Sequence, residues 1–285
     1  MASLLQLKSR IKAAQNVSKT TKAMQMIAAS HLKKAQHAAL SGRPYVQKLE
    51  TLTQNVARKI EDKNIHPYVQ DRMDTGKSLI IFLAPDKGLC GGLITNLLKE
   101  FIRNVQTEKN SYVVIGKKAE GYVTRLEKNV IAAFHFGTTL PKFAMIFPIM
   151  KIIDDYYLSG KVDSVKILGA HFTSIFTQTP KIDTILPIKF NGGEGEKEGE
   201  AQTSFEPNPS ELLPSLLKHY VEMTLYQHLL ESFVSEQAAR MISMQNATNN
   251  AKDLIEDYKL EYNKTRQAKI TSEILDITGT RLQAQ

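Results

Sequence analysis

Cysteine is almost absent from this 285-residue sequence, and no apolar run approaches the length of a membrane-spanning helix. The single cysteine, Cys90, can form neither an intrachain disulfide nor a cysteine-rich metal site, which favours a reducing compartment. The longest apolar runs, Leu79–Ala84 and Phe143–Met150, are far shorter than the ~20 residues that cross a bilayer. We therefore expect a soluble or membrane-peripheral protein.

Acidic residues are missing from the first 49 positions, and the first carboxylate belongs to Glu50. The net charge of +8 therefore belongs to the N-terminal segment, since the rest of the chain is close to neutral. The cations of this segment are Lys8, Arg10, Lys12, Lys19, Lys22, Lys33, Lys34, Arg43 and Lys48. This distribution predicts a local acidic partner. A mitochondrial transit peptide and a basic nucleic-acid-binding helix remain alternatives, although the segment has no aromatic residue before Tyr45.

Glycine and proline are also missing from residues 3–41, where alanine, lysine, glutamine, leucine and methionine dominate. This composition predicts a long helix that Ser3 can cap. The sequence Gly-Arg-Pro at 42–44 should kink or interrupt the helix, and the helical pattern resumes to about Ile60. A predicted apolar stripe along the helix consists of Leu4, Leu7, Ile11, Ala14, Val17, Met24, Ile27, Ala28 and Leu32.

The C-terminal third has no proline after Pro214 and no glycine from there to Gly279. Steps of alternately three and four residues give sixteen positions, of which twelve are apolar or aromatic and four are polar but uncharged. They are Leu213, Leu216, Tyr220, Met223, Gln227, Leu230, Val234, Gln237, Met241, Met244, Thr248, Ala251, Ile255, Tyr258, Tyr262 and Thr265. This seam predicts a coiled-coil helix on the order of 100 Å long. The N-terminal helix is its obvious partner.

The residues between the two helical stretches show alternating strand and helix patterns. Strands are predicted at Ser78–Ala84, Tyr112–Ile115, Val130–Phe136 and Ser164–Leu168. Helices are predicted at Leu93–Gln106, Ala119–Leu126 and Lys142–Leu158. The last of these helices contains Pro148 and should be kinked, and Thr173–Gln178 with Ile182–Ile188 could form a terminal hairpin. The alternation predicts right-handed βαβ units and a parallel sheet.

The predicted fold class is therefore α/β plus long α. The N-terminal segment 1–60 and the C-terminal segment 210–285 form a two-helix coiled coil, and a Rossmann-like α/β domain at 77–190 is inserted between them. Residues 61–76 are a polar connection. The glycine- and glutamate-rich region 191–209 should be a flexible loop that leads into the second long helix.

Catalytic motifs are missing as well. The sequence has no G-x-S-x-G, H-E-x-x-H or C-x-x-C, and its histidines are scattered, so we predict no catalytic residues and no metal site. The loop Asp86–Gly92 follows a strand and opens a helix, where an α/β fold would hold a phosphate. It lacks both glycine-rich phosphate fingerprints, so a tight structural turn is the favoured interpretation. A nucleotide-binding α/β enzyme remains the alternative.

Four segments of the chain resemble the gamma subunit of F-type ATP synthases, in the order of that family. They are Lys19–Ala29 (KTTKAMQMIAA), Asp86–Leu93 (DKGLCGGL), Ser235–Met241 (SEQAARM) and Tyr262–Glu273 (YNKTRQAKITSE). The third and fourth segments are very specific to the family, and the resemblance extends over essentially the whole chain.

The resemblance implies an antiparallel coiled coil that turns inside a hexamer of alpha and beta subunits. It also implies that the α/β domain lies outside the hexamer with the epsilon subunit and the membrane c-ring. The catalytic sites belong to beta, so this chain is expected to be a non-catalytic rotor without a cofactor. By position, Arg266 and Gln267 match residues that hold a catch loop of beta, and Met24 with neighbouring Lys22 matches the shaft that faces beta's lever region. The sequences Arg43-Pro44-Tyr45 and His66-Pro67-Tyr68 resemble bacterial members of the family more than mitochondrial ones, which implies the cytoplasmic face of a bacterial inner membrane.

Overall fold

A computed structural model describes residues 3–60, 66–70, 76–104, 109–189, 206 and 208–282, with side chains as far as residue 275. The chain divides into two compact units. One consists of Met1–Ala29 with Arg240–Gln285, and the other of Ser30–Ala239. We call them the shaft unit and the head unit. This division cuts both long helices, so the domain ranges suggested by the sequence stay a prediction, and most of the 191–209 loop lies outside the described residues.

Helix α1 (Leu4–Arg58) is continuous, and the predicted interruption at 42–44 is wrong. Contacts with the second long helix, α5 (Pro209–Leu282), hold this part of the helix in the head unit. Arg43 pairs with Glu231, and Gly42 lies so close to Gln227 that an added Cβ would be 2.8 Å from its side-chain oxygen. Tertiary packing therefore offsets the hydrogen bond that Pro44 cannot make.

The predicted stripe of α1 is wrong at three positions, because Val17, Met24 and Ile27 are exposed. The inward positions instead follow an uninterrupted heptad that includes the polar residues Ser18 and Thr21. Every member is buried or half-buried: Leu4, Leu7, Ile11, Ala14, Ser18, Thr21, Gln25, Ala28, Leu32, Ala35, Ala39, Gly42, Val46, Leu49, Thr53 and Val56. Spacing, more than hydrophobicity, identifies this face of the helix.

All sixteen predicted seam positions of α5 are buried or half-buried, as the sequence predicts. The two helices run antiparallel within each unit. In the shaft unit, the hydroxyls of Thr21 and Thr248 lie 2.8 Å apart, and the Arg10 guanidinium lies 5.9 Å from the ring centre of Tyr258. In the head unit, the side-chain amide of Gln227 donates to the carbonyl oxygen of Ala39 at 3.1 Å.

The sheet of the head unit has the strand order β3-β2-β1-β4-β5. Its strands are β1 (Ser78–Leu83), β2 (Ser111–Ile115), β3 (Asn129–Phe134), β4 (Ser164–Phe172) and β5 (Gln178–Leu186). The first four are parallel, as predicted, but β5 pairs antiparallel with β4. The predicted strand at 173–178 is mainly the turn of this hairpin, because β4 extends to Phe172.

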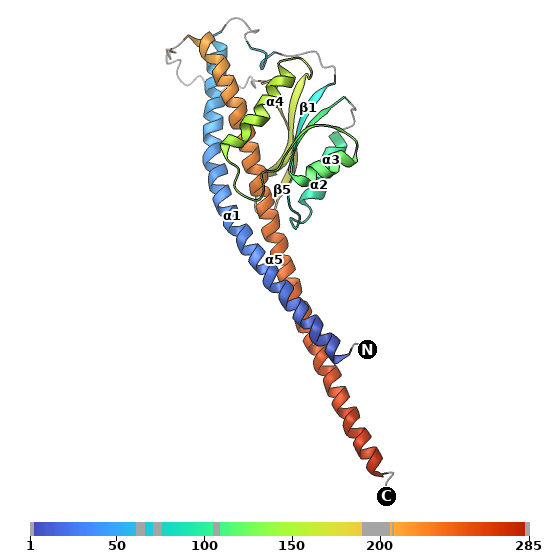
Figure 1. Cartoon of the computed structure of the whole chain (residues 1–285). Coiled ribbons are helices and arrows are strands. Elements are labelled where there is room, and N and C mark those ends of the chain that lie inside the picture. The colour runs from blue at the N-terminus through green and yellow to red at the C-terminus, as the bar shows by residue number, and fades with distance from the viewer. Residues whose placement is uncertain are drawn as a thin grey trace. The chain divides into compact units, whose positions relative to one another are not determined.

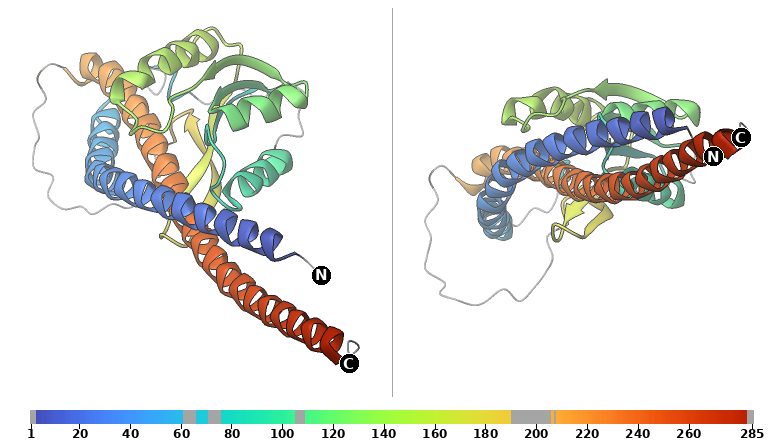
Figure 2. Two further views of the ribbon diagram at one scale, coloured as in Figure 1. Left: turned by 60° about the horizontal axis from the view of Figure 1, so that its bottom comes forward. Right: turned by 90° about the horizontal axis from the view of Figure 1, so that it is seen from below.

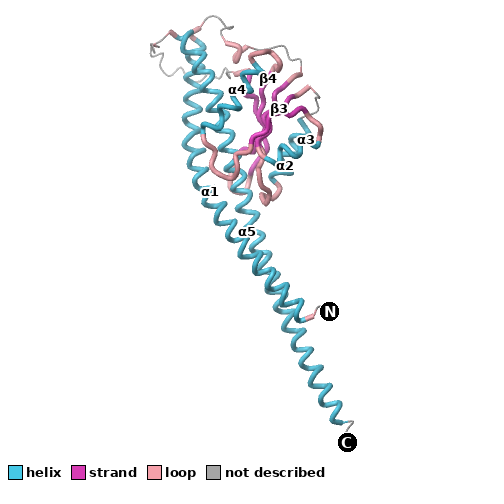
Figure 3. Tube along the Cα trace, viewed as in Figure 1, coloured by secondary structure: helices cyan, strands magenta, loops and turns pink. Residues whose placement is uncertain are grey.

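Helices cover both faces of this sheet (Figures 1 and 3). Alternate residues of β1 point to opposite sides: Ile80 and Phe82 pack with α2 (Leu93–Asn104) and α3 (Lys117–Arg125), whereas Leu79 and Ile81 pack with α4 (Phe147–Tyr157) and α5. The predicted kink at Pro148 is wrong. A 3-10 turn, Phe143–Ile146, precedes α4, and Pro148 occupies the first turn of the α-helix, where its missing N–H costs nothing.

Tyr68 is a core residue within the segment predicted to be a polar connection. It is 2% exposed, and its hydroxyl donates to a carboxylate oxygen of Asp154 on α4. Its carbonyl oxygen accepts from the N–H of Ile188 at 2.8 Å, and its ring meets that of Tyr157 edge-on. Burial and the adjacent carboxylate raise the pKa of the Tyr68 hydroxyl, so it remains a donor at all physiological pH values.

Candidate partner-contact surface

The last part of α5 continues beyond the end of α1 as a single helix within the shaft unit (Figures 1 and 2). Thr265 is the last half-buried residue, and every described side chain from Arg266 to Leu275 is exposed. The fading of the heptad after Tyr262 predicts this change. Arg266 and Gln267 lie where the unpaired helix begins, so both side chains are available to a partner.

Lys22 and Met24 lie on the outer side of α1. Both are exposed, Met24 by 38%, and the Lys22 ammonium donates to the side-chain oxygen of Gln25 at 3.3 Å. Thr248 marks the level of α5 that faces Thr21, and from there to Arg266 the helix rises about 27 Å. The structure therefore does not bring the four predicted contact residues together, but places them at two levels of the shaft unit.

Exposed apolar side chains accompany both levels, and the sequence analysis missed this feature. Val17, Met26 and Ile27 are each more than half exposed on α1. Among the described side chains of α5 in the shaft unit, the exposed large apolar residues are Leu254, Leu260, Ile270, Ile274 and Leu275. The signal was present in the sequence, because these residues fall outside the heptads. These uncovered apolar side chains are available to another protein.

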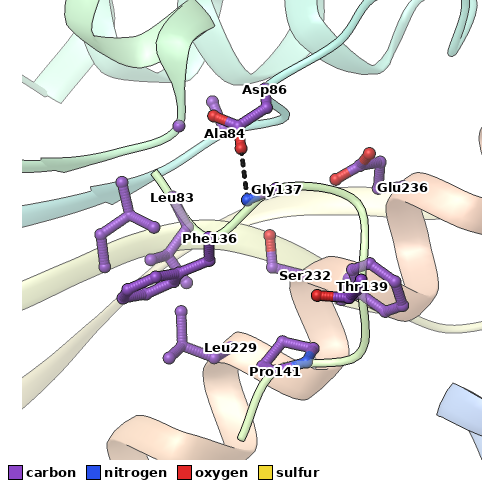
Figure 4. Close-up of a pocket in the computed structure, with 13 residues that line it drawn as sticks. Leu83, Ala84, Asp86, Phe136, Gly137, Thr139, Pro141, Leu229, Ser232 and Glu236 are labelled. Carbon is purple, nitrogen blue, oxygen red and sulfur yellow. Dashed lines mark hydrogen bonds between the residues drawn. The ribbon is translucent and has the colours of Figure 1, made fainter. Parts of the chain in front are cut away.

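The loop Asp86–Gly92 forms a structural turn. The Asp86 carboxylate accepts hydrogen bonds from the N–H of Lys117 at 2.9 Å and from the N–H of Gly137 at 2.7 Å (Figure 4). It thereby occupies the start of α3, which would otherwise attract an anion. The adjacent cavity holds about 50 Å³ and is lined by Leu229, Ser232 and other residues of α5. Small-molecule sites are typically ~300 Å³ or more, so this crevice does not support nucleotide binding.

Sequence comparisons identify the family. The family model described as ATP synthase matches residues 3–281. The ATP synthase gamma chain of Dehalococcoides mccartyi strain BAV1 is 38% identical over 98% of both chains. Those of Nitrosococcus oceani and Legionella pneumophila strain Corby are 36% and 34% identical with the same coverage. This chain belongs to the ATP synthase gamma chain family. The family suggested by the four sequence segments is therefore confirmed.

Solved structures show the same fold. A chain of the Tetrahymena thermophila mitochondrial ATP synthase central stalk and c-ring structure aligns with a TM-score of 0.60 and 22% identity, covering 80% of this chain and 99% of that one. A chain of the Euglena gracilis mitochondrial enzyme aligns with a TM-score of 0.58 and 18% identity, covering 88% and 94%. The predicted architecture, two long terminal helices with an inserted α/β domain, is confirmed.

Glu231 joins three elements of this gamma-family chain, and no pattern in the sequence indicates this role. Its side chain is 9% exposed. One carboxylate oxygen accepts from Arg43 of α1 at 3.0 Å and from Gln227 at 3.2 Å, and the other lies 2.5 Å from the Nδ1 atom of His171 on β4. Arg43 also reaches the carbonyl oxygen of Phe172 at 3.4 Å. The cluster fastens both long helices to the sheet of the head unit.

Two histidines of the head unit should make this gamma-family chain less stable in mild acid. Burial lowers the pKa of both His228 and His66. Nearby carboxylates raise these pKa values, those of Asp183 and Glu231 at His228 and that of Asp154 at His66, but the effect of burial is larger. The folded state binds a proton at these two histidines less well than the unfolded chain does, so protonation favours unfolding. The free energy of unfolding is therefore largest above pH ~6.5 and decreases as the pH falls below that value.

Urea unfolding of the full chain at pH 7.5 and pH 5.5 measures this effect. We expect a lower midpoint at pH 5.5, and a smaller difference between the two pH values in His228→Gln. Replacement of the exposed His37 by glutamine serves as the control and should leave the difference unchanged. An identical pH dependence in His228→Gln and the wild type would contradict the assignment.

Among the described residues, no group of three or more His, Cys, Asp or Glu side chains could hold a metal ion. Within the same part of the chain, no helix is long and apolar enough to cross a membrane.

Proposed function

We propose that this chain is the rotating central-stalk subunit of an F-type ATP synthase. It couples ion flow through the membrane c-ring to sequential conformational changes at the catalytic sites of an alpha/beta hexamer. The observation that carries the proposal is the exposed, unpaired end of α5 in a chain of the gamma family. The exposed leucine and isoleucine side chains of this single helix support a surrounding protein.

The chain acts without chemistry of its own, through differential contact. Three identical beta subunits become unequal when an asymmetric shaft touches each of them differently, and rotation changes which subunit binds, converts or releases nucleotide. The acid-free residues 1–49 support such a role, because their cations attract acidic loops of beta without fixing one rotary angle. The α/β domain binds the epsilon subunit and the c-ring outside the hexamer.

The proposed contacts of the shaft lie at its two levels. Arg266 and Gln267 hold a catch loop of beta, with the guanidinium suited to a two-pronged contact with a carboxylate. Met24 and Lys22 face the lever region of beta, where the exposed Met24 side chain packs and the Lys22 ammonium meets acidic groups. The complex holds the chain peripherally at the cytoplasmic face of a bacterial inner membrane.

Replacing Arg266 and Gln267 together by alanine tests these contacts. Loss of one well-placed charged hydrogen-bonded contact typically costs ~1.5–3 kcal/mol, so in the reconstituted complex we expect the ATPase rate to fall by about tenfold or more, and the torque of single molecules to fall with it. The fold should be unaffected, because both side chains are exposed.

Lys264→Ala is the matched control. It removes an exposed cation about 200° around the helix from Arg266 and should leave rate and torque nearly unchanged. Unchanged rate and torque in the double variant would overturn the assigned contacts. Failure of the wild-type chain to assemble with alpha and beta would overturn the proposed function itself.

A further inference from the structure

Helices α2 and α3 lie on the side of the sheet away from α4 and α5 (Figure 1). A groove lies between α2 and α3. Its open volume is about 260 Å³, and its floor is formed by Ile94 and Leu98 of α2 and Tyr122 of α3. All three side chains are only partly buried by their own fold. The groove is therefore an apolar surface that the chain does not cover itself.

The apolar floor continues along α2. Ile102 is 54% exposed and lies two turns beyond Ile94 on the same side of the helix, with Leu98 between them. Residues four apart lie on one face, so the three side chains form a stripe about 12 Å long. A stripe of this shape suits an elongated apolar partner such as one face of a helix.

The edge of the groove formed by α3 is cationic. Lys117, Lys118 and Arg125 line it and are exposed, and no carboxylate belongs to the described residues of its lining. The nearby Glu120 instead pairs with His135 at 2.8 Å. Cations that are not neutralised beside an apolar floor favour a partner with negative charge next to its own apolar face.

The second observation is Gly121, whose lack of a side chain leaves room for a close approach to α3. It lies in the middle of this nine-residue helix, is exposed, and has a φ angle in the ordinary helical region. A Cβ added there would meet nothing within 4 Å, so the fold of this chain does not require glycine. Glycine inside a helix is nonetheless destabilising relative to alanine, and its known use is to admit another backbone.

We propose that the α2–α3 groove binds an acidic amphipathic helix of a partner subunit. Its apolar face packs on Ile94, Leu98 and Ile102, its carboxylates meet Lys117, Lys118 and Arg125, and its backbone passes over Gly121. The occupant is a subunit of the same complex, so this inference rests on the proposed function, but the site uses none of the residues proposed for the shaft contacts and peptide binding tests it separately from assembly.

A stapled helix of about four turns, with leucines along one face and glutamates along the other, is the probe. Fluorescence anisotropy with the full chain should give micromolar binding. Gly121→Trp should abolish it by filling the groove, and the triple variant Lys117→Glu, Lys118→Glu, Arg125→Glu should weaken it by about tenfold or more. The same helix with lysines in place of glutamates should not bind.

Two controls separate the groove from general attraction to a basic protein. The double variant Lys8→Glu, Lys12→Glu changes exposed cations of α1 and should lower the affinity for the stapled helix only slightly. Gly121→Ala should raise Tm by about 2 °C. Absence of wild-type binding, undiminished binding by Gly121→Trp, or equal weakening by the α1 variant would each overturn the proposal, and a lower Tm in Gly121→Ala would remove its second support.

Discussion

Glu231→Ala is expected to lower the free energy of unfolding by about 3 kcal/mol, a large part of the stability of a typical domain. The carboxylate is nearly buried and binds Arg43, Gln227 and His171 at the same time. Removing it leaves these donors without their acceptor, and it opens a small cavity where α1, α5 and β4 meet.

The size of this loss follows from the exposure of the partners. Breaking a buried ion pair typically costs ~3–5 kcal/mol. Here the side chains of Arg43 and His171 are 35% and 44% exposed, so water can solvate them after the substitution, and the lower end of that range applies. Glu231→Gln keeps the shape but presents an amide N–H₂ to one of the donors, so an intermediate loss of ~1–2 kcal/mol is expected.

Chemical unfolding followed by circular dichroism measures these differences. Glu256→Ala is the control, because Glu256 is an exposed acid on the same helix and its removal should change stability by no more than ~0.5 kcal/mol. If Glu231→Ala and Glu256→Ala have equal effects, then the cluster does not fasten the two helices to the sheet.

Periodicity predicted the long helix α5 well because its seam is mostly apolar and every seam position faces inward. It predicted the face of α1 less well. Ser18, Thr21 and Gln25 occupy inward positions, whereas the apolar Val17, Met24 and Ile27 are exposed. An assignment of the inward face from hydrophobicity alone selects Val17, Met24 and Ile27 and is therefore wrong at these positions. The exposed apolar residues lie outside the heptad spacing, so the spacing distinguishes them from the inward face whereas hydrophobicity does not.

Long-range contacts account for the other differences. Arg43 and Glu231 are separated by 188 positions, and neither residue type suggests a buried pair. Likewise, Tyr68 belongs to a polar segment and becomes part of the core only because Asp154 and Tyr157 lie beside it in the fold. The candidate contact residues came from family resemblance, since a single exposed arginine and glutamine have no signature in composition or spacing.

Gly116→Ala is expected to be the most damaging single-methyl change in the head unit. Gly116 joins β2 to α3 with a φ angle of 99°, which is strained for any residue with a Cβ. An added Cβ would lie 1.9 Å from the carbonyl oxygen of Ala84, far inside van der Waals contact. The obstacle is backbone rather than a flexible side chain, so it cannot rotate away.

The surroundings of Gly116 leave little room for adjustment. The N–H of Gly116 donates to the carbonyl oxygen of Phe134 at 2.8 Å. The N–H of Ala84 donates to the carbonyl oxygen of Ile115 at 2.9 Å. The peptide group between Ile115 and Gly116 is therefore held by β3 on one side and by the end of β1 on the other. Moving it would break these bonds at the carboxyl ends of three adjacent strands. Strain of this kind typically costs ~3–5 kcal/mol, which should lower Tm by more than about 5 °C.

Gly121→Ala is the matched comparison for Gly116→Ala, because it adds the same methyl group at the same helix. Gly116 directly precedes α3, whereas Gly121 lies within it. Gly121 has an ordinary helical φ angle and open space around it, so alanine there should stabilise the chain by about 0.5–1 kcal/mol. Thermal unfolding of both variants should therefore give Tm shifts of opposite sign. A Gly116→Ala chain as stable as the wild type would show that the end of β2 can move away from Ala84, and would remove the physical reason for glycine at this turn.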